Sequence, residues 1–145
     1  LRVFRESGWV SDAYVAPDDS KVLLVLSDCT ARLYQMAKGQ VVGKLSLENL
    51  GAYIPPFPVA FSQDGRRILF CLDSCNVKVV DADSGDLVSL CQGGRHHITS
   101  AGFSPDALQV VVSYYEPSAK VFCAASGQCV QELDHSDVVS LAVFA

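Results

Sequence analysis

Short runs of apolar or alternating apolar and polar residues recur along the chain, with turn residues between them. One representative set comprises residues 98–103, 108–113, 119–123 and 128–133. Each run has the length of a β-strand, and no window shows the periodicity of a helix. S-P-D or S-Q-D-G turns follow the first run of a set, and S-G turns follow the third. The pattern predicts an all-β chain built from units of four short strands.

These units form an internal repeat with a period of a little over 40 residues. Three segments align without a gap: A-Y-V-A-P-D-D-S-K-V-L-L-V from Ala13, V-A-F-S-Q-D-G-R-R-I-L-F-C from Val59 and A-G-F-S-P-D-A-L-Q-V-V-V-S from Ala101. The alignment superposes Val15, Phe61 and Phe103, then Asp18, Asp64 and Asp106, and later Gly39, Gly85 and Gly127. A fixed period of this length is typical of repeat architectures such as propellers and solenoids.

A four-stranded antiparallel unit with two apolar faces cannot bury both faces alone. A neighbouring sheet must stack on each side, and radial stacking of such sheets makes a propeller. The extra residues between Gly39 and Phe61 include E-N-L-G-A-Y-I-P-P-F-P, whose three prolines favour an enlarged loop. A compact β-sandwich is the alternative if the chain forms no stacked repeat.

V-A-F-S-Q-D-G, followed by V-K-V-V-D-A-D-S-G-D-L-V, resembles the repeat of the WD-repeat β-propeller family. The resemblance implies about three blades of four antiparallel strands, belonging to a larger, seven-bladed ring. It places these blades roughly at residues 9–47, 57–91 and 97–133, with a further blade starting at 135–145. The positions that match the family's repeat signature are Phe61, Asp64, Gly65, Asp81, Gly85, Phe103, Asp106, Gly127 and His135.

Other residues replace most of the family's signature residues in this chain. The family's Trp position holds Tyr34, Val80 and Phe122, and the following Asp position holds Gln35, Asp81 and Cys123. The family's buried network joins a His before the innermost strand to an Asp in a turn, a Ser or Thr, and the Trp. Its His position holds Glu6, Ala52, Gly94 and finally His135, and its Asp position holds Asp28, Ser74 and Glu116. We therefore expect no complete network in these three blades, and stability that depends on packing.

Charge and composition limit the functions that the chain can have. The net charge is −5 and no basic run exceeds Arg66-Arg67, so we expect no binding to nucleic acid or to membranes. The six cysteines lie mainly in strand-like runs, which favours buried free thiols over a disulfide framework. With no N-x-S/T site, this composition fits a cytoplasmic, or alternatively nuclear, protein. The first residue is Leu1, and we expect both ends to interrupt a longer repeat array that supplies further blades.

Candidate catalytic and metal-binding groups are few. His96 and His97, with Cys91 upstream, could be metal ligands, but their spacing matches no zinc motif and favours an exposed loop. The residues His135, Ser136 and Asp137 are adjacent in sequence without the context of a nucleophile elbow. No glycine-rich phosphate loop is present. We predict no catalytic residue, no metal and no cofactor.

Loops at one rim of a propeller are the remaining candidate surface. By alignment, this rim presents loops that precede inner strands and turns between second and third strands. The residues predicted there are Trp9, Asp28, Tyr53, Asp73, Arg95, His96, Tyr115 and Glu116. Trp9 and Tyr53 can equally cover the ends of their own blades, whereas Arg95 and His96 are better candidates for binding.

Three functions follow from these observations. The first is a non-catalytic scaffold, a WD-repeat platform for protein–protein interaction within a larger multidomain protein. The second, by analogy with the family, is the sensor or autoinhibitory WD-repeat region of a signalling NTPase of the NACHT or another STAND type. The third is a propeller enzyme or nucleic-acid binder, against which the acidic charge and the lack of an acid–base pair both argue.

Overall fold

Three four-stranded antiparallel sheets, each built from consecutive strands, make up the described part of the chain. The computed structural model describes residues 6, 8–28, 30–46, 59–71 and 75–145. The first blade contains β1 (Val10–Val15), β2 (Lys21–Leu26), β3 (Thr30–Gln35) and β4 (Gln40–Ser46). The second contains β5 (Val59–Phe61), β6 (Arg67–Cys71), β7 (Asn76–Asp81) and β8 (Leu87–Gln92). The third contains β9 (Ile98–Phe103), β10 (Gln109–Tyr114), β11 (Ser118–Cys123) and β12 (Cys129–Asp134). The predicted all-β fold with four antiparallel strands per unit is confirmed.

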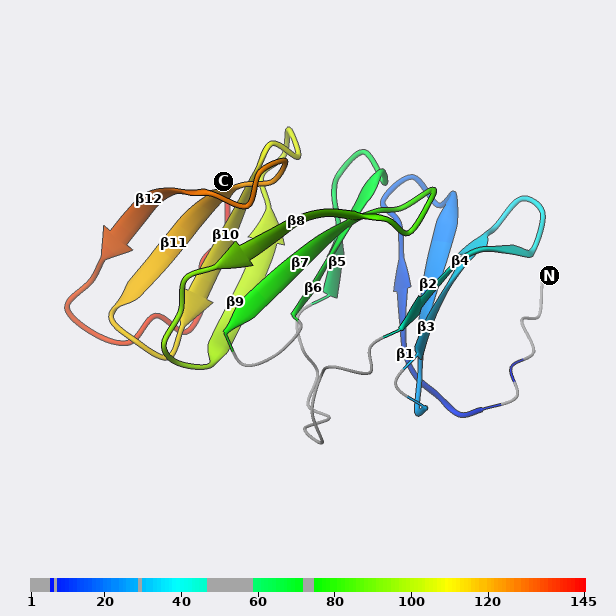
Figure 1. Ribbon diagram of the computed structural model, residues 1–145, viewed down its shortest axis with the longest axis horizontal. Coiled ribbons are helices and arrows are strands. Elements are labelled where there is room, and N and C mark those ends of the chain that lie inside the picture. The colour runs from blue at the N-terminus through cyan, green and yellow to red at the C-terminus, as the bar shows by residue number, and fades with distance from the viewer. Residues whose placement is uncertain (1–5, 7, 29, 47–58, 72–74) are drawn as a thin grey trace.

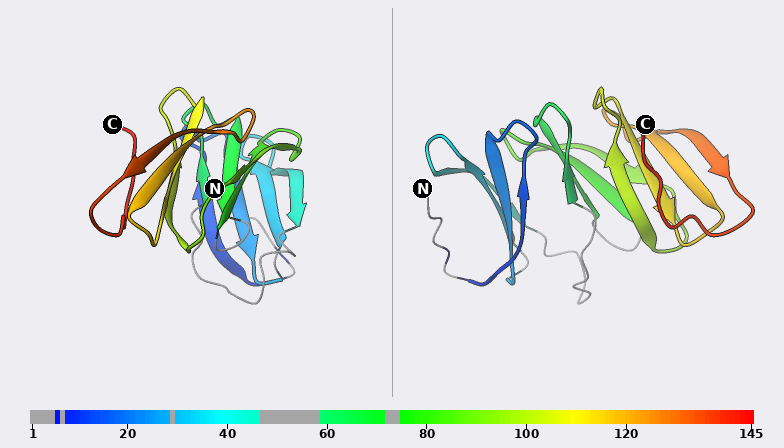
Figure 2. Two further views of the ribbon diagram at one scale, coloured as in Figure 1. Left: turned by 60° about the vertical axis from the view of Figure 1, so that its left-hand side comes forward. Right: turned by 180° about the vertical axis from the view of Figure 1, so that it is seen from behind.

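The three sheets stand in a row with their faces together, as Figures 1 and 2 show. Turns between first and second strands, and between third and fourth strands, lie along the upper edge in Figure 1, which we call the upper rim. Along the lower edge, the lower rim, lie residues 8–9 before β1, the β2–β3 turn, the β8–β9 connection and the β10–β11 turn. The surface predicted for binding is therefore one physical edge of the molecule.

The core consists of the layers between neighbouring sheets. Strand β6 illustrates how the sequence builds it, because its side chains alternate between two faces. Ile68 and Phe70 join a cluster with Leu23 and Leu33 of the first blade. Leu69 and Cys71 join a second cluster with residues of the third blade, namely Val110, Val112, Tyr114, Phe122 and Ala124. Burial on both sides thus explains why β6 is apolar at each position from Ile68 to Cys71.

The turn between the first and second strands has the same conformation in each blade. Asp19, Gly65 and Ala107 have φ values of 57°, 66° and 58°. The preceding aspartate of each turn accepts a backbone N–H: Ser20 donates to Asp18 at 3.0 Å, Arg66 to Asp64 at 3.0 Å and Leu108 to Asp106 at 3.0 Å. The aspartates aligned in the sequence therefore each cap one turn of the same type.

Polar contacts between blades also repeat. The Nζ atom of Lys21 lies 3.5 Å from the carbonyl oxygen of Gly65 in the next blade. The guanidinium of Arg67, at the equivalent position, donates to the carbonyl of Ala107 at 3.1 Å. Lys21 also pairs with Asp83 at 3.0 Å. Gly65 and Ala107, the left-handed residues of the turns in the second and third blades, thus each present a carbonyl to a cation of the preceding blade.

The segment 138–144 is not the inner strand that the repeat predicts. No strand is assigned in the described residues after β12. The segment instead lies along β9: Thr99 Oγ1 donates to the carbonyl of Val139 at 2.7 Å, and the amide of Ala142 donates to Ser100 Oγ at 3.0 Å. Figure 2 shows this segment in red beside the third sheet. A strand requires a partner strand for its backbone groups, and the described residues provide none here.

Candidate functional site

The lower rim exposes several of the side chains predicted to lie there. Trp9 is 86% exposed and Tyr115 is 64% exposed, and Arg95 and His96 are also exposed. Within the described residues, none of these four side chains forms a hydrogen bond or ion pair. Tyr53 and Asp73 lie outside the described residues. The structure therefore places Trp9 on the lower rim of the first blade, and Arg95, His96 and Tyr115 on that of the third.

Asp28 is exposed on the lower rim but is engaged in its own turn. Its Oδ1 atom accepts hydrogen bonds from the amide of Thr30 at 3.1 Å and from Thr30 Oγ1 at 2.6 Å. The hydroxyl bond is the main reason that the pKa of Asp28 lies below its usual value. This carboxylate stabilises the turn between β2 and β3.

Glu6 forms a buried polar cluster in the first blade. One carboxylate oxygen accepts a hydrogen bond from the hydroxyl of Tyr34, and the other pairs with the guanidinium of Arg32. The Glu6 side chain is only 2% exposed. Burial, followed by this hydrogen bond, raises the pKa of Tyr34. Glu6 and Tyr34 occupy the family's His and Trp positions, so a different polar pair links the same two places.

In the third blade, glycines occupy the loop that corresponds to the one containing Glu6 in the first blade. Gly94 lies so close to the ring of Tyr114 that a Cβ atom at this position would overlap it. Lys120, which aligns with Arg32, donates from Nζ to the carbonyl of Gly93 at 2.6 Å. At the family's His and Trp positions the first blade has Glu6 and Tyr34, and the third has Gly94 and Phe122.

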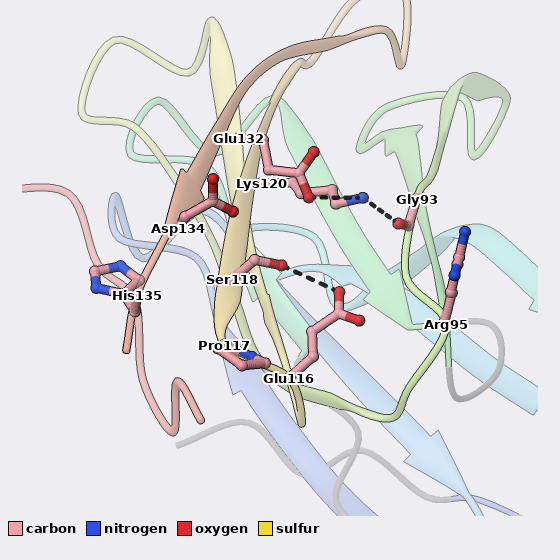
Figure 3. Close-up of a pocket in the computed structure, with 9 residues that line it drawn as sticks. All are labelled: Gly93, Arg95, Glu116, Pro117, Ser118, Lys120, Glu132, Asp134 and His135. Carbon is pink, nitrogen blue, oxygen red and sulfur yellow. Dashed lines mark hydrogen bonds and ion pairs between the residues drawn. The ribbon is translucent and has the colours of Figure 1, made fainter. Parts of the chain in front are cut away.

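A groove opens at the lower rim of the third blade (Figure 3). It has a volume of about 600 Å³. One wall is the β8–β9 connection, with Gly93 and Arg95, and the other is formed by the β10–β11 turn with strands β11 and β12. The residues of that second wall are Glu116, Pro117, Ser118, Lys120, Glu132, Asp134 and His135.

The groove is polar and carries charges of both signs. Lys120 pairs with Glu132 at 3.3 Å in addition to its bond with Gly93. Glu116 accepts a hydrogen bond from the hydroxyl of Ser118 at 3.2 Å. Figure 3 shows Arg95 across the groove from Glu116. The arrangement can bind a polar segment through ion pairs and hydrogen bonds.

The sequence predicted some of these residues and missed others. Arg95 and Glu116 were predicted for this rim, and the structure brings them to one groove together with His135. Lys120, Glu132 and Asp134 were missed, because they lie in the outer strands rather than in loops. The pairing of β11 with β12, which places Lys120 opposite Glu132 and Ser118 opposite Asp134, would have indicated them.

Other chemical groups were also predicted from the sequence. All five described cysteines are free thiols. Cys71 and Cys91 are buried as expected, Cys75 and Cys123 are only partly buried, and Cys129 is exposed, so the expectation of burial is wrong there. Cys29 lies outside the described residues. Within the residues that the structure describes, no group of three or more His, Cys, Asp or Glu side chains is placed to hold a metal ion. The same part of the chain has no helix long and apolar enough to cross a membrane.

Comparisons with known proteins identify the fold. No family model matches the sequence, and no curated protein matches it. Among solved structures, the crystal structure of the RRP9 WD40 repeats matches with a TM-score of 0.70 and 20% sequence identity, over 93% of this chain and 42% of that one. The structure of U3-55K matches with a TM-score of 0.69 and 21% identity, again over 93% of this chain and 42% of the other.

This chain thus spans less than half the length of the WD40 structures that it matches. The agreement covers three four-stranded sheets in sequence order, as the repeat in the sequence indicated. The chain has the fold of WD40-repeat propeller blades.

Proposed function

We infer that this chain is a non-catalytic platform for protein–protein interaction, and that its lower rim makes the contacts. The observation that carries this proposal is the set of exposed side chains on that rim: Trp9, Arg95, His96 and Tyr115. Aromatic and arginine side chains are the types that most often dominate binding energy at protein interfaces. Their side chains have no hydrogen-bonding or ionic partner within the described residues, so a bound protein would compete with no internal contact of these kinds.

The rigid packing of the blades supports the same proposal. The β8–β9 connection and the β10–β11 turn are joined to strands that contribute Val110, Val112 and Tyr114 to the core between the second and third blades. Loops held on a packed scaffold can present a defined binding surface with little loss of conformational freedom on binding. The ring in which these blades work is proposed to be larger, because the matched WD40 structures extend well beyond them.

A photo-cross-linking amino acid placed on each rim tests this function. His96 and Tyr115 are replaced singly on the lower rim, and Ala125 and Ser126 serve as matched positions on the upper rim of the same blade. We expect both lower-rim positions to cross-link the same partner protein in the cells that make this chain, and Arg95→Ala to reduce that product. Equal products from both rims, or none from the lower rim, would contradict the proposal.

A further inference from the structure

The third blade has acidic residues in its outermost strand where the other two blades have none. In this blade Ser118 lies opposite Asp134, and Lys120 lies opposite Glu132. The corresponding pairs are Thr30 with Ser46 and Arg32 with Lys44 in the first blade, and Asn76 with Gln92 and Lys78 with Leu90 in the second.

This difference indicates that the fold does not require acidic residues at these positions. Three sheets of the same topology form with serine and lysine, with glutamine and leucine, or with two carboxylates at these outer positions. Strand pairing therefore does not require Glu132 or Asp134. Both residues line the groove at the lower rim, which gives their charges a defined place.

The groove neutralises only some of its charges internally. Lys120 is satisfied by Glu132 at 3.3 Å and by the carbonyl of Gly93 at 2.6 Å. Asp134 lies opposite Ser118 in the sheet, and Glu116 accepts a hydrogen bond from the same serine. Neither Asp134 nor Glu116 has a cationic partner within the described residues. Two uncompensated carboxylates therefore flank Ser118 on one wall.

Arg95 provides the opposite charge on the other wall. Its side chain stands across the groove from Glu116 in Figure 3. Within the described residues its guanidinium pairs with no carboxylate. The groove is consequently acidic along the outer strands and basic at one lip, a pattern that can orient a bound chain.

We propose that this groove binds an extended segment of a partner protein that carries a lysine or arginine. The cation of that side chain lies at the wall formed by Glu116 and Asp134, and Arg95 binds an acidic side chain or a backbone carbonyl of the same segment. The inference rests on the proposed function and specifies its partner. Phosphate backbones are disfavoured because the acidic wall repels them, and the open groove of about 600 Å³ suits an extended chain.

Titration of the ¹⁵N-labelled protein with short peptides tests this directly. The probe is a glycine–serine peptide with one central arginine, and the reference peptide has glutamate at that position. We expect the arginine peptide to shift the amide signals of Ser118 and His135 and the glutamate peptide to leave them unchanged. An exposed ion pair contributes roughly two- to fivefold in affinity, so the double variant Glu116→Gln, Asp134→Asn is expected to weaken binding about tenfold.

The control variant changes the net charge by the same amount on the other rim. Asp19 and Asp86 are exposed on the upper rim, and their replacement by asparagine is expected to leave the affinity of the arginine peptide unchanged. Equal weakening by both double variants would overturn the proposal, because it would show a general effect of net charge. Absence of any groove shift with the arginine peptide would overturn it as well.

A separate readout distinguishes this proposal from the function on which it rests. If His96 and Tyr115 cross-link a partner that the groove variants still bind normally, the interaction platform stands and the basic-segment proposal fails. If the lower rim cross-links nothing, the platform itself fails. A second peptide with an aspartate added near the arginine is expected to bind more tightly, and Arg95→Glu is expected to abolish that gain.

Discussion

At the scale of single residues, Glu6 shows how a divergent repeat keeps a blade joined at its rim. Its carboxylate binds both Tyr34 and Arg32, although the Glu6 side chain is 2% exposed. A carboxylate and a tyrosine here connect the positions that a histidine and a tryptophan occupy in the family repeat. No rule of hydrophobic periodicity predicts this pair, because its members are 28 residues apart in the sequence.

Replacement of Glu6 by alanine is expected to destabilise the fold by about 1–3 kcal/mol, because it leaves the Arg32 guanidinium partly buried without its partner. Tyr34→Phe removes only one hydrogen bond and is expected to cost about 1 kcal/mol. Urea unfolding followed by fluorescence measures both values. A stability for Glu6→Ala equal to that of the unmodified protein would contradict the structural role of this cluster.

Tyr114, unlike Tyr34, is a buried tyrosine whose hydroxyl lacks a hydrogen-bond partner in the described part of the chain. Its side chain is fully buried. Burial also raises its pKa. We expect Tyr114→Phe to leave the free energy of unfolding unchanged or to increase it by up to about 1 kcal/mol, because the change removes an unsatisfied buried group. A loss of stability in the same urea assay would indicate a hydrogen bond to this hydroxyl.

Gly127 tests the close approach of two blades. It has a φ of 72°, and a Cβ atom there would overlap the carbonyl oxygen of Leu90 in the second blade. Gly127→Ala is therefore expected to lower the melting temperature, with a cost of about 1–3 kcal/mol. Gly43→Ala is the matched control, because its Cβ would lie 3.7 Å from that of Leu33, an ordinary contact. Equal melting temperatures for the two variants would contradict this packing.

At the scale of elements, the aspartate-capped turns should make the fold sensitive to acid. Hydrogen bonds from nearby serine hydroxyls are the main cause that lowers the pKa values of Asp18, Asp64 and Asp106. The backbone amide of Ser84 is the main cause for Asp81. A carboxyl group whose pKa is lower in the folded state stabilises the fold above its unfolded pKa of about 3.9. This contribution is lost as the pH falls through the lower, folded-state value.

The variant Asp64→Asn keeps an acceptor oxygen in the turn but removes the titrating group. We expect it to lose less stability than the unmodified protein when the pH is lowered below about 4, as measured by urea midpoints across that range. Asp86→Asn is the control, because the Asp86 carboxylate accepts no hydrogen bond within the described residues. An unchanged pH dependence for Asp64→Asn would show that this turn does not contribute to it.

The sequence predicted the strands better than the end of the chain. Alternation and turn residues gave the strand Ile98–Phe103 with the same bounds as β9, because both faces of that blade are constrained by packing or hydrogen bonding. The segment 138–144 has the same pattern but is no strand, because hydrophobic alternation does not provide a hydrogen-bonding partner. Its contacts with Thr99 and Ser100 could not be inferred from periodicity.

At the scale of the whole molecule, the repeat and the antiparallel sheets give the chain two rims of different character. On the upper rim, the turns between first and second strands are capped by aspartates that accept hydrogen bonds from their own backbone. The lower rim carries exposed aromatic and cationic side chains and the groove of the third blade. Sequence alignment predicted which loops share a rim, but the groove needed the pairing of β11 with β12 and the position of the β8–β9 connection.

Hydrogen–deuterium exchange on this chain, with and without the partner captured at His96, tests the central claim most directly. The account predicts that the partner slows exchange of the amides in the β8–β9 connection and the β10–β11 turn, and leaves the turns of the upper rim unchanged. Protection confined to the upper rim, or spread along the outer strands of all three blades, would contradict the assignment of the lower rim as the binding surface.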